Sequence, residues 1–211
     1  VDNYYNPVQP NAKVQLITED PFDPSINAQI LTAGTTVFYL YMQTVNEAPG
    51  WTIVASTTAD SATSLLPNTS PIVPVSAGAA AKLQLLLPGE TAVPGSTTGL
   101  IAGKQGSPTN AIAGVAHNVT VNLTDAYYNV VTDIAMPTVL LTSTDPNDNE
   151  SSYFGGNPQS LNPQTGSAAV GVYFNTSSSW TLTVSDDLYT NLYANETSTT
   201  VFVRPNSPTR F

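Results

Sequence analysis

The chain repeats itself once, and this internal repeat limits its architecture more than any other feature. Several short segments of the first half recur in the second half in the same order, at separations between 123 and 129 residues. Ordered matches at a nearly constant offset indicate duplicated structural units rather than chance similarity. The matching pairs are residues 2–8 and 125–131, 14–21 and 139–146, 51–54 and 180–184, 73–75 and 201–203, and 82–83 and 210–211.

The repeat divides the chain into two modules, which we expect at residues 1–81 and 82–211. The second module has a leading segment, residues 82–124, ahead of its Asp-Ala-Tyr-Tyr-Asn turn. The first module has no counterpart, because Val1 directly precedes the matching turn. The sequence therefore predicts either a window cut from a longer array or a first module without its leading strands. The absence of an initiator Met agrees with an excerpt or a processed product.

Within each unit the residue pattern is that of β-strands. Polar and apolar residues alternate with a period of two, and no stretch shows the 3.6-residue stripe of a helix. Short strands between Pro, Gly and Asn turns predict an all-β fold of two tandem immunoglobulin-like β-sandwich modules. The Gly/Pro/Thr-rich insertion at residues 88–114 lies between two strands, so we expect an ordered excursion rather than a linker. The expected strands are residues 13–18, 35–43, 52–55, 82–87, 118–123, 138–143, 168–174, 180–184 and 199–204.

The charge composition excludes several partners. Only 9% of the residues are charged, the formal net charge is −10, and Lys and Arg together number five. Nucleic acids and anionic membranes both require clustered cations, so neither is an expected partner. No apolar run approaches the roughly 18 residues of a membrane span, so no membrane insertion is expected. The chain has no Cys, which excludes disulfides and thiolate metal sites.

Three stretches resemble a known class of repeats. They are residues 82–95 (KLQLLLPGETAVPG), residues 119–131 (VTVNLTDAYYNVV) and residues 142–146 (TSTDP). Together they resemble the immunoglobulin-like repeats of very long bacterial surface proteins, and the Asp-Ala-x-x-Asn turn resembles modules of invasin and intimin type. The resemblance implies a surface-anchored or secreted tandem array, hence an extracellular location. It brings no catalytic residues, and the insert at residues 150–166 is longer than its pattern.

Two acidic loops at equivalent places are the candidate metal site. Asp20 and Asp23 lie three residues apart, as do Asp145 and Asp148. Calcium prefers six to eight hard oxygen ligands, and each loop offers carboxylates, Asn and backbone carbonyls. The other interpretation is an Asx-turn, in which Asp accepts turn amides ahead of Pro. Calcium is therefore the one cofactor that the sequence suggests, held at these four residues.

Several other residues are expected to have structural roles. His117 is the only His, which leaves almost no material for a catalytic dyad, and we expect it at a surface or satisfied strand position. Trp51 and Trp180 begin equivalent strands, where they anchor a core or, alternatively, stack on a sugar. Asp2 and Asp125 open the repeated turns and are expected to accept turn amides.

The functional hypothesis is a structural repeat module of an extracellular surface protein or filament, acting as a spacer and assembly unit. The alternative is an adhesin module that binds a glycan or protein through its end loops, and no enzymatic activity is expected. The expected partners are neighbouring repeats or subunits of the same protein. If the first module lacks its leading strands, an outside strand completes it. Val14, Leu16, Val37 and Tyr39 would then line the vacant position.

Overall fold

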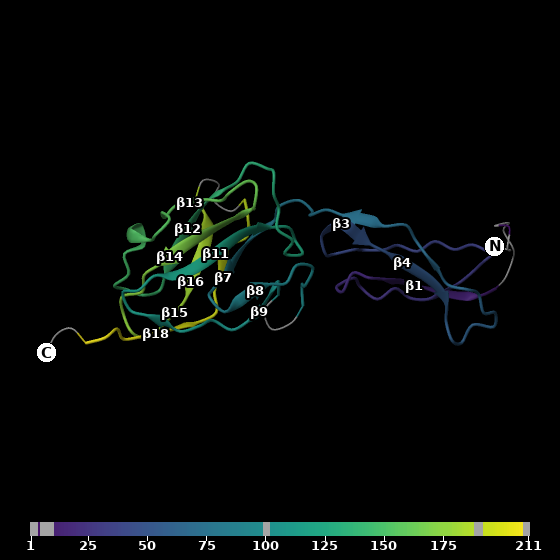
Figure 1. Cartoon of the computed structure of the whole chain (residues 1–211), viewed down its shortest axis with the longest axis horizontal. Helices are drawn as coiled ribbons and strands as arrows, with labels where there is room; N and C mark the ends of the chain where they lie inside the picture. The colour runs from purple at the N-terminus through teal and green to yellow at the C-terminus, as the bar shows by residue number, and fades with distance from the viewer. Residues whose placement is uncertain (1–3, 5–10, 99–101, 188–191, 209–211) are drawn as a thin grey trace. The chain divides into compact units, whose positions relative to one another are not determined.

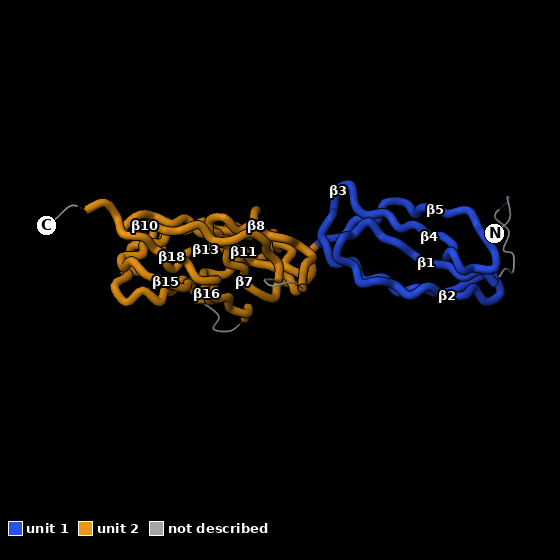
Figure 2. Tube along the Cα trace, turned by 90° about the horizontal axis from the view of Figure 1, so that it is seen from below, with its two compact units in different colours: residues 1–76 blue, residues 77–211 orange. Residues whose placement is uncertain are grey.

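The computed structural model describes residue 4 and residues 11–98, 102–187 and 192–208, and its regular structure is almost entirely β (Figure 1). One 3₁₀ turn, Glu150–Ser152, is the only helical element among these residues. No helix in the described ranges has the length and hydropathy to cross a membrane. The chain forms two compact units, residues 1–76 and 77–211, so the division lies five residues before the expected boundary (Figure 2).

Unit 2 is a sandwich of two β-layers. Its first layer places β11 between β14 and β7, both antiparallel to it. Its second layer contains the sheet β13-β12-β16-β17 and the sheet β10-β18-β15, in which β10 runs parallel to β18. The bounds are β7 Lys82–Leu86, β10 Ala111–Ile112, β11 His117–Thr124, β12 Thr138–Ser143, β13 Gln159–Ser160, β14 Ser167–Val172, β15 Ser179–Trp180, β16 Leu182–Asp186, β17 Glu196–Thr197 and β18 Val201–Arg204.

The core of unit 2 lies between these layers because alternate residues of each strand point inward. Leu83, Leu85, Val119 and Val121 come from the first layer and are fully buried. They belong to one cluster with buried residues of the second layer, which include Val139, Leu141, Leu182, Val184, Val201 and Val203. The predicted sandwich, with six of its strands at nearly the expected residues, is confirmed for this unit.

The Gly/Pro/Thr-rich insertion is ordered in its described part. It contains the antiparallel hairpin of β8 (Glu90–Ala92) and β9 (Lys104–Gly106), and β10 follows it. Gly103 precedes β9 with a positive φ of 77°, and a Cβ there would lie 2.1 Å from Cγ of Tyr128. This close approach explains why the position requires glycine. The expected ordered excursion is confirmed outside residues 99–101.

Unit 1 contains one main sheet, in the order β2-β1-β4-β5, and the separate strand pair β3-β6. Its strand bounds are β1 Lys13–Thr18, β2 Gln29–Ile30, β3 Asn46–Trp51, β4 Ile53–Thr57, β5 Asn68–Thr69 and β6 Val73–Val75.

The pairing registers of unit 1 reproduce those of the second layer of unit 2. Leu16 lies opposite Ala55 in β1 and β4, as Leu141 lies opposite Val184 in β12 and β16. The edge strands match too, because Val14 pairs with Gln29 as Val139 pairs with Gln159. Trp51 lies opposite Val73 as Trp180 lies opposite Val201. The internal repeat is therefore a repeat of strand pairing, residue for residue.

The first layer of the sandwich has no counterpart among the described residues of unit 1. In unit 2 that layer is β7, β11 and β14, whereas unit 1 contains only equivalents of β12, β13 and β15 to β18. The strand expected at residues 35–43 is wrong, since residues 36–43 have no assigned strand. Their sequence alternates correctly, but a strand also needs a partner, and no equivalent of β11 occurs among the described residues of unit 1 to provide one.

Candidate functional site

The exposed inner face of unit 1 is the feature of the chain that most resembles a binding surface. Among the described residues, Ala12 is the only buried hydrophobic residue in unit 1. All other buried hydrophobic residues lie in unit 2. Unit 1 nevertheless carries large hydrophobic residues: Phe38, Leu40 and Met42 are only half-buried, and Val37, Tyr39 and Tyr41, which alternate with them, are 66%, 76% and 65% exposed. A sheet that buries no core on one face leaves apolar side chains accessible there, which is a feature of interaction surfaces.

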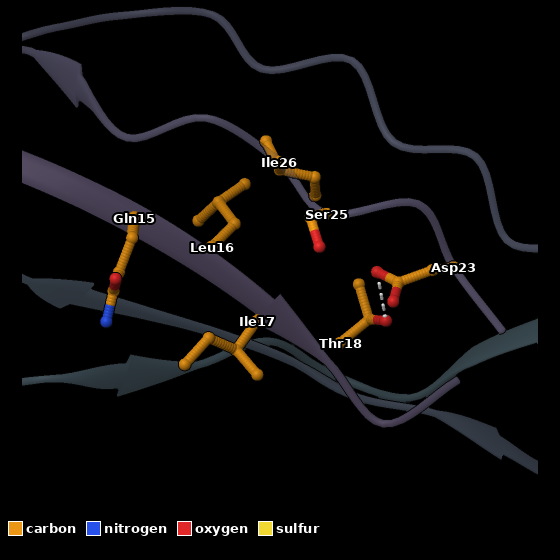
Figure 3. A pocket seen from close by; sticks show the side chains of 7 residues that line it. All are labelled: Gln15, Leu16, Ile17, Thr18, Asp23, Ser25 and Ile26. Carbon is orange, nitrogen blue, oxygen red and sulfur yellow. Dashed lines mark hydrogen bonds between the residues drawn. The ribbon is translucent and has the colours of Figure 1, made fainter. Parts of the chain in front are cut away.

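The inner side of β1 contributes the apolar floor of this surface. Val14 and Leu16 are half-buried, whereas their equivalents Val139 and Leu141 in unit 2 are fully buried beneath the other layer. Leu16 lies on the side of β1 that faces Ser25 and Ile26, while Ile17 lies on the opposite side (Figure 3). Leu16, Ile17, Ser25 and Ile26 are among the residues that line a groove of ≈ 240 Å³.

A second groove adjoins the first through shared residues. Its lining includes Ser25 and Ile26 again, together with Gln29, Tyr39 and Tyr41. The two tyrosine rings therefore stand beside the segment that follows the Asp20 loop. Tyr39 was expected at the vacant position, and the structure places it at this groove with its side chain exposed.

The Asp20 loop positions this segment through a carboxylate that binds backbone amides. Oδ2 of Asp20 accepts hydrogen bonds from the amides of Gln43 (2.6 Å) and Thr44 (2.9 Å). Oδ1 accepts from the amide of Phe22 (3.0 Å) and from the hydroxyl of Thr44 (2.6 Å). Burial raises the pKa of Asp20, but the hydrogen bonds outweigh it and hold the pKa below its usual value. The carbonyl of Thr44 in turn accepts from the indole nitrogen of Trp51 (2.8 Å).

The Asp145 loop repeats this arrangement atom for atom. Oδ2 of Asp145 accepts from the amides of Asn175 (2.7 Å) and Thr176 (2.8 Å), and Oδ1 accepts from the amide of Asn147 (3.0 Å). Burial raises the pKa of Asp145, and these bonds again bring it below its usual value. The indole of Trp180 donates to the carbonyl of Thr176 (2.7 Å). We call this repeated arrangement of Asp, two amides and Trp the carboxylate clasp.

The other two predicted ligands also accept hydrogen bonds from neighbouring side chains. Oδ2 of Asp23 accepts from the hydroxyl of Thr18 at 2.6 Å, and Oδ2 of Asp148 accepts from the phenol of Tyr153. Burial and the bond to Asp148 raise the pKa of Tyr153, so the phenol remains the donor. No group of three or more His, Cys, Asp or Glu side chains suited to a metal occurs among the described residues. Calcium at Asp20, Asp23, Asp145 and Asp148 stays a prediction, and an ion there would compete with these donors.

The remaining candidates have structural surroundings. Trp51 and Trp180 occupy equivalent positions, as expected, and both are partly buried, with Trp180 packed against the core of unit 2. Asp125 accepts turn amides from Tyr127 (2.8 Å) and Asn129 (3.0 Å), as expected, while Asp2 lies outside the described residues.

His117 differs from its expected setting. It is buried in β11 beside Phe174, with a ring-centroid distance of 6.2 Å, and its Nε2 has no hydrogen-bond partner. Burial lowers the pKa of its imidazole, which favours the neutral form. A neutral buried ring in contact with an aromatic side chain is a core residue, so the expectation of a surface or satisfied position is wrong.

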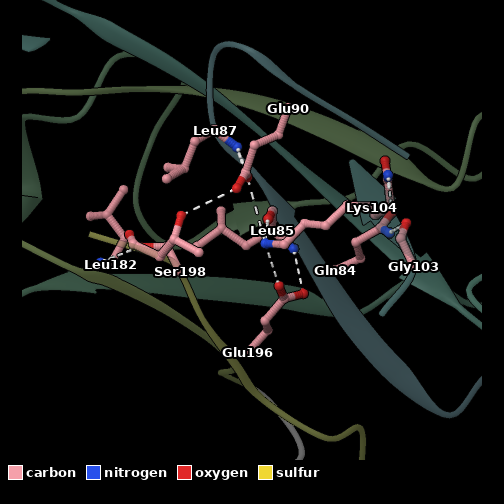
Figure 4. Close-up of polar contacts among 11 residues, drawn as sticks. Gln84, Leu85, Leu87, Glu90, Gly103, Lys104, Leu182, Glu196 and Ser198 are labelled. Carbon is pink, nitrogen blue, oxygen red and sulfur yellow. Dashed lines mark hydrogen bonds and ion pairs between the residues drawn. The ribbon is translucent and has the colours of Figure 1, made fainter. Parts of the chain in front are cut away.

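Charged side chains bind the backbone along the outer edge of β7 in unit 2, a feature that the sequence did not predict (Figure 4). Nζ of Lys104 lies 2.6 Å from Oε1 of Glu196 and 3.5 Å from Oε2 of Glu90, and it donates to the carbonyl of Leu85 at 2.8 Å. The amide of Leu85 donates to Glu196 and that of Leu87 donates to Glu90, both at 2.9 Å. Side chains thus occupy the backbone groups that an added strand would need.

Comparisons with known proteins return only remote likenesses. No family model matches, and no curated protein matches. Among solved structures, the D0-D1 domain of intimin has 14% identity and a TM-score of 0.36 over 94% of this chain and 85% of its own. The adhesin InvE of Yersinia pseudotuberculosis has 15% identity and a TM-score of 0.35 over 96% of this chain and 51% of its own.

A third similar structure has a different function in its title. It is a glycosyl hydrolase family 2 member from Bacteroides cellulosilyticus DSM 14838, with 14% identity and a TM-score of 0.32 over 95% of this chain and 26% of its own. The chain thus spans about half of the adhesin and a quarter of the hydrolase. Because all three likenesses are remote, the all-β, immunoglobulin-like fold is established by the strand pairing of this chain itself.

Proposed function

We propose that the chain is a tension-bearing spacer made of tandem immunoglobulin-like modules in an extracellular surface protein or filament. The observation that carries this proposal is parallel pairing between early and late segments of unit 2. Lys82 at the start of β7 forms a parallel bridge with Ala194, just before β17. β10 also pairs in parallel with β18, with Ala111 opposite Val203. Tension applied at the two ends of a module pulls parallel neighbouring strands in opposite directions along their length. The hydrogen bonds between the strands must then break together.

The buried charges reinforce the same junction. Glu196 belongs to β17, near the C-terminal end of the unit, and it binds both the amide of Leu85 in β7 and the ammonium of Lys104. Glu196 thus connects β17 to β7 through the Leu85 amide and to β9 through Lys104, and these bonds resist the sliding of β7 against β17. The duplicated registers and the carboxylate clasp in both units further support a module built for repetition.

Single-molecule pulling tests the proposal directly. The chain has no Cys, so cysteine handles can be placed freely. Handles at positions 78 and 207 load the parallel strands in shear, whereas handles at positions 78 and 195 pull both strands from the same end and peel them apart. Shear loading should give one high-force event that releases about 450 Å from the residues of unit 2. Peeling should occur at clearly lower force, and equal forces in the two geometries would refute the spacer role.

A matched pair of variants refines this test. Lys104→Met removes the buried cation of unit 2 and should lower the shear force. Lys13→Met removes a cation from the exposed Lys13–Asp60 pair of unit 1 and should leave that force unchanged. A module that only displays loops would show no difference between the two variants.

The adhesin alternative is favoured by one specific observation. The exposed rings of Tyr39 and Tyr41 stand beside a groove with Asn27 and Gln29, and aromatic faces with amide donors are suited to sugars. Titration of the ¹⁵N-labelled chain with oligosaccharides would show localised shifts at residues 24–41 if this function holds. The Tyr39→Ala/Tyr41→Ala variant should then lose the shifts.

A further inference from the structure

Residues 36–42 have the side-chain pattern of a sandwich strand without a partner strand. Phe38, Leu40 and Met42 are half-buried, and they alternate with the exposed residues Val37, Tyr39 and Tyr41. This alternation is the signature of an extended segment with one face toward a core. Among the described residues, no strand pairs with this segment.

The carboxylate clasp shows which residues of unit 2 correspond to this segment. Asp20 binds the amides of Gln43 and Thr44 just as Asp145 binds those of Asn175 and Thr176. Residues 36–42 therefore correspond to residues 168–174, most of which form β14.

The two segments also alternate in phase. Phe38 corresponds to Val170 and Leu40 to Val172, and both of those residues are fully buried in the core of unit 2. The two segments differ in their pairing. β14 pairs with β11 over its full length, whereas residues 36–42 pair with no described strand.

The structure assigns a partner of defined chemistry to this position. We propose that unit 1 is completed by a strand of the β11 type, which adds antiparallel to residues 36–42 and covers Val14 and Leu16. Such a strand has aliphatic residues at alternate positions, as β11 has Val119, Val121 and Leu123, all fully buried. This inference goes beyond the spacer role, because it concerns how one module binds a strand rather than how it bears force.

Three features of unit 1 agree with this occupant. The inner face has the same strand register as its covered equivalent in unit 2, so a strand of the same geometry fits it. Asp23 is the only charged residue that lines the groove beside Leu16, and it is bonded to Thr18, so this face suits an uncharged strand. The backbone of residues 36–42 pairs with no strand in the described part of the chain, whereas the edge of β7 in unit 2 is already occupied by Glu196, Lys104 and Glu90.

The test supplies the strand to the full chain in two ways. In the first, a second copy of residues 77–123 is fused ahead of Val1, because residues 2–8 align with residues 125–131. In the second, the synthetic peptide HNVTVNLT, the sequence of β11, is added to the unmodified chain. Amide hydrogen exchange at residues 36–42 is the readout, and Trp51 fluorescence in a Trp180→Phe background follows the unfolding of unit 1.

We expect exchange at residues 36–42 to slow by at least ~10-fold with the fused copy, because paired amides exchange only on opening. The denaturation midpoint of unit 1 should rise as well, and the peptide should protect the same residues at high concentration. The matched control is a fused copy in which the residues copied from Val119, Val121 and Leu123 are Asn, and it should protect nothing.

Two variants of the acceptor test the phase of the alternation. Leu40→Asp places a charge on the inner face and should abolish the protection, whereas Tyr39→Asp places it on the outer face and should retain it. Unchanged exchange with both the fused copy and the peptide would overturn the inference. Equal protection by the Asn control, or equal effects of the two Asp variants, would overturn it as well.

Discussion

Replacing Lys104 by Met tests whether the buried charges at the β7 edge stabilise unit 2. The side chain of Lys104 is only 2% exposed, and its ammonium pairs with Glu196 at 2.6 Å and binds the carbonyl of Leu85 at 2.8 Å. Met keeps most of the volume but leaves two carboxylates, Glu90 and Glu196, without their cation. Breaking a buried ion pair from one side costs about 3–5 kcal/mol, so we expect unit 2 to lose that much stability.

The assay is urea unfolding in a Trp51→Phe background. The chain has two Trp residues, one in each unit, so the fluorescence of Trp180 then reports unit 2 alone. The double variant Lys104→Met/Glu196→Gln should cost less than the sum of its single variants by about 1–3 kcal/mol, because the two groups interact directly. A loss below about 1 kcal/mol for Lys104→Met, with additive effects in the double variant, would refute the reasoning.

Three further predictions concern the clasp and the acidic loops. Trp180→Ala should destabilise unit 2 by about 2–3 kcal/mol, less than for a fully buried Trp, as chemical denaturation would show. Asp145→Asn should cost about 2–3 kcal/mol near pH 7, because the new amide nitrogen, whichever way the side chain is turned, replaces an oxygen that accepts at least one of the three backbone amides. Since its folded pKa is lowered, the contribution of Asp145 should be complete above the unfolded value of ~3.9 and should be lost as pH falls through the folded pKa; a pH series of melting curves that is parallel for wild type and variant would contradict this. If calcium binds at Asp20, Asp23, Asp145 and Asp148, calorimetry should detect it and EDTA should lower the melting temperature; no heat and no shift would remove the idea.

Most of the expected strands pair within the described residues, whereas residues 36–43 have no strand partner there. Residues 13–18 and 138–143 form strands at the expected limits, because alternation and an available neighbour agree there. Residues 35–43 alternate equally well, yet pairing is a property of two segments and cannot be read from one. The register equivalence of Trp51 and Trp180 was predictable from the repeat, whereas their half-burial depends on neighbours that the repeat does not identify.

The candidate sites show the same limit. The repeated spacing of Asp20 and Asp145 located two equivalent loops correctly, but it could not show that amides 23 and 30 residues downstream bind their carboxylates. Lys104 gave no signal, because a single Lys in a Gly- and Ser-rich stretch is typical of an exposed loop. Lys104 is one of only five Lys and Arg residues in the chain, but this small number does not indicate that its side chain is buried.

The carboxylate clasp also has a consequence for the colloidal behaviour of the protein in acid. The isoelectric point calculated from the sequence is ≈ 4.1, so the net charge vanishes near that pH. Hydrogen bonds hold the pKa of both clasp carboxylates below the ordinary value, so the clasps favour the folded units to lower pH than unbonded carboxylates would. Mutual repulsion between molecules is therefore weakest at a pH where the clasps still favour the folded units. Mild acidification should bring intact modules together as a reversible precipitate, and neutralisation should redissolve them without refolding.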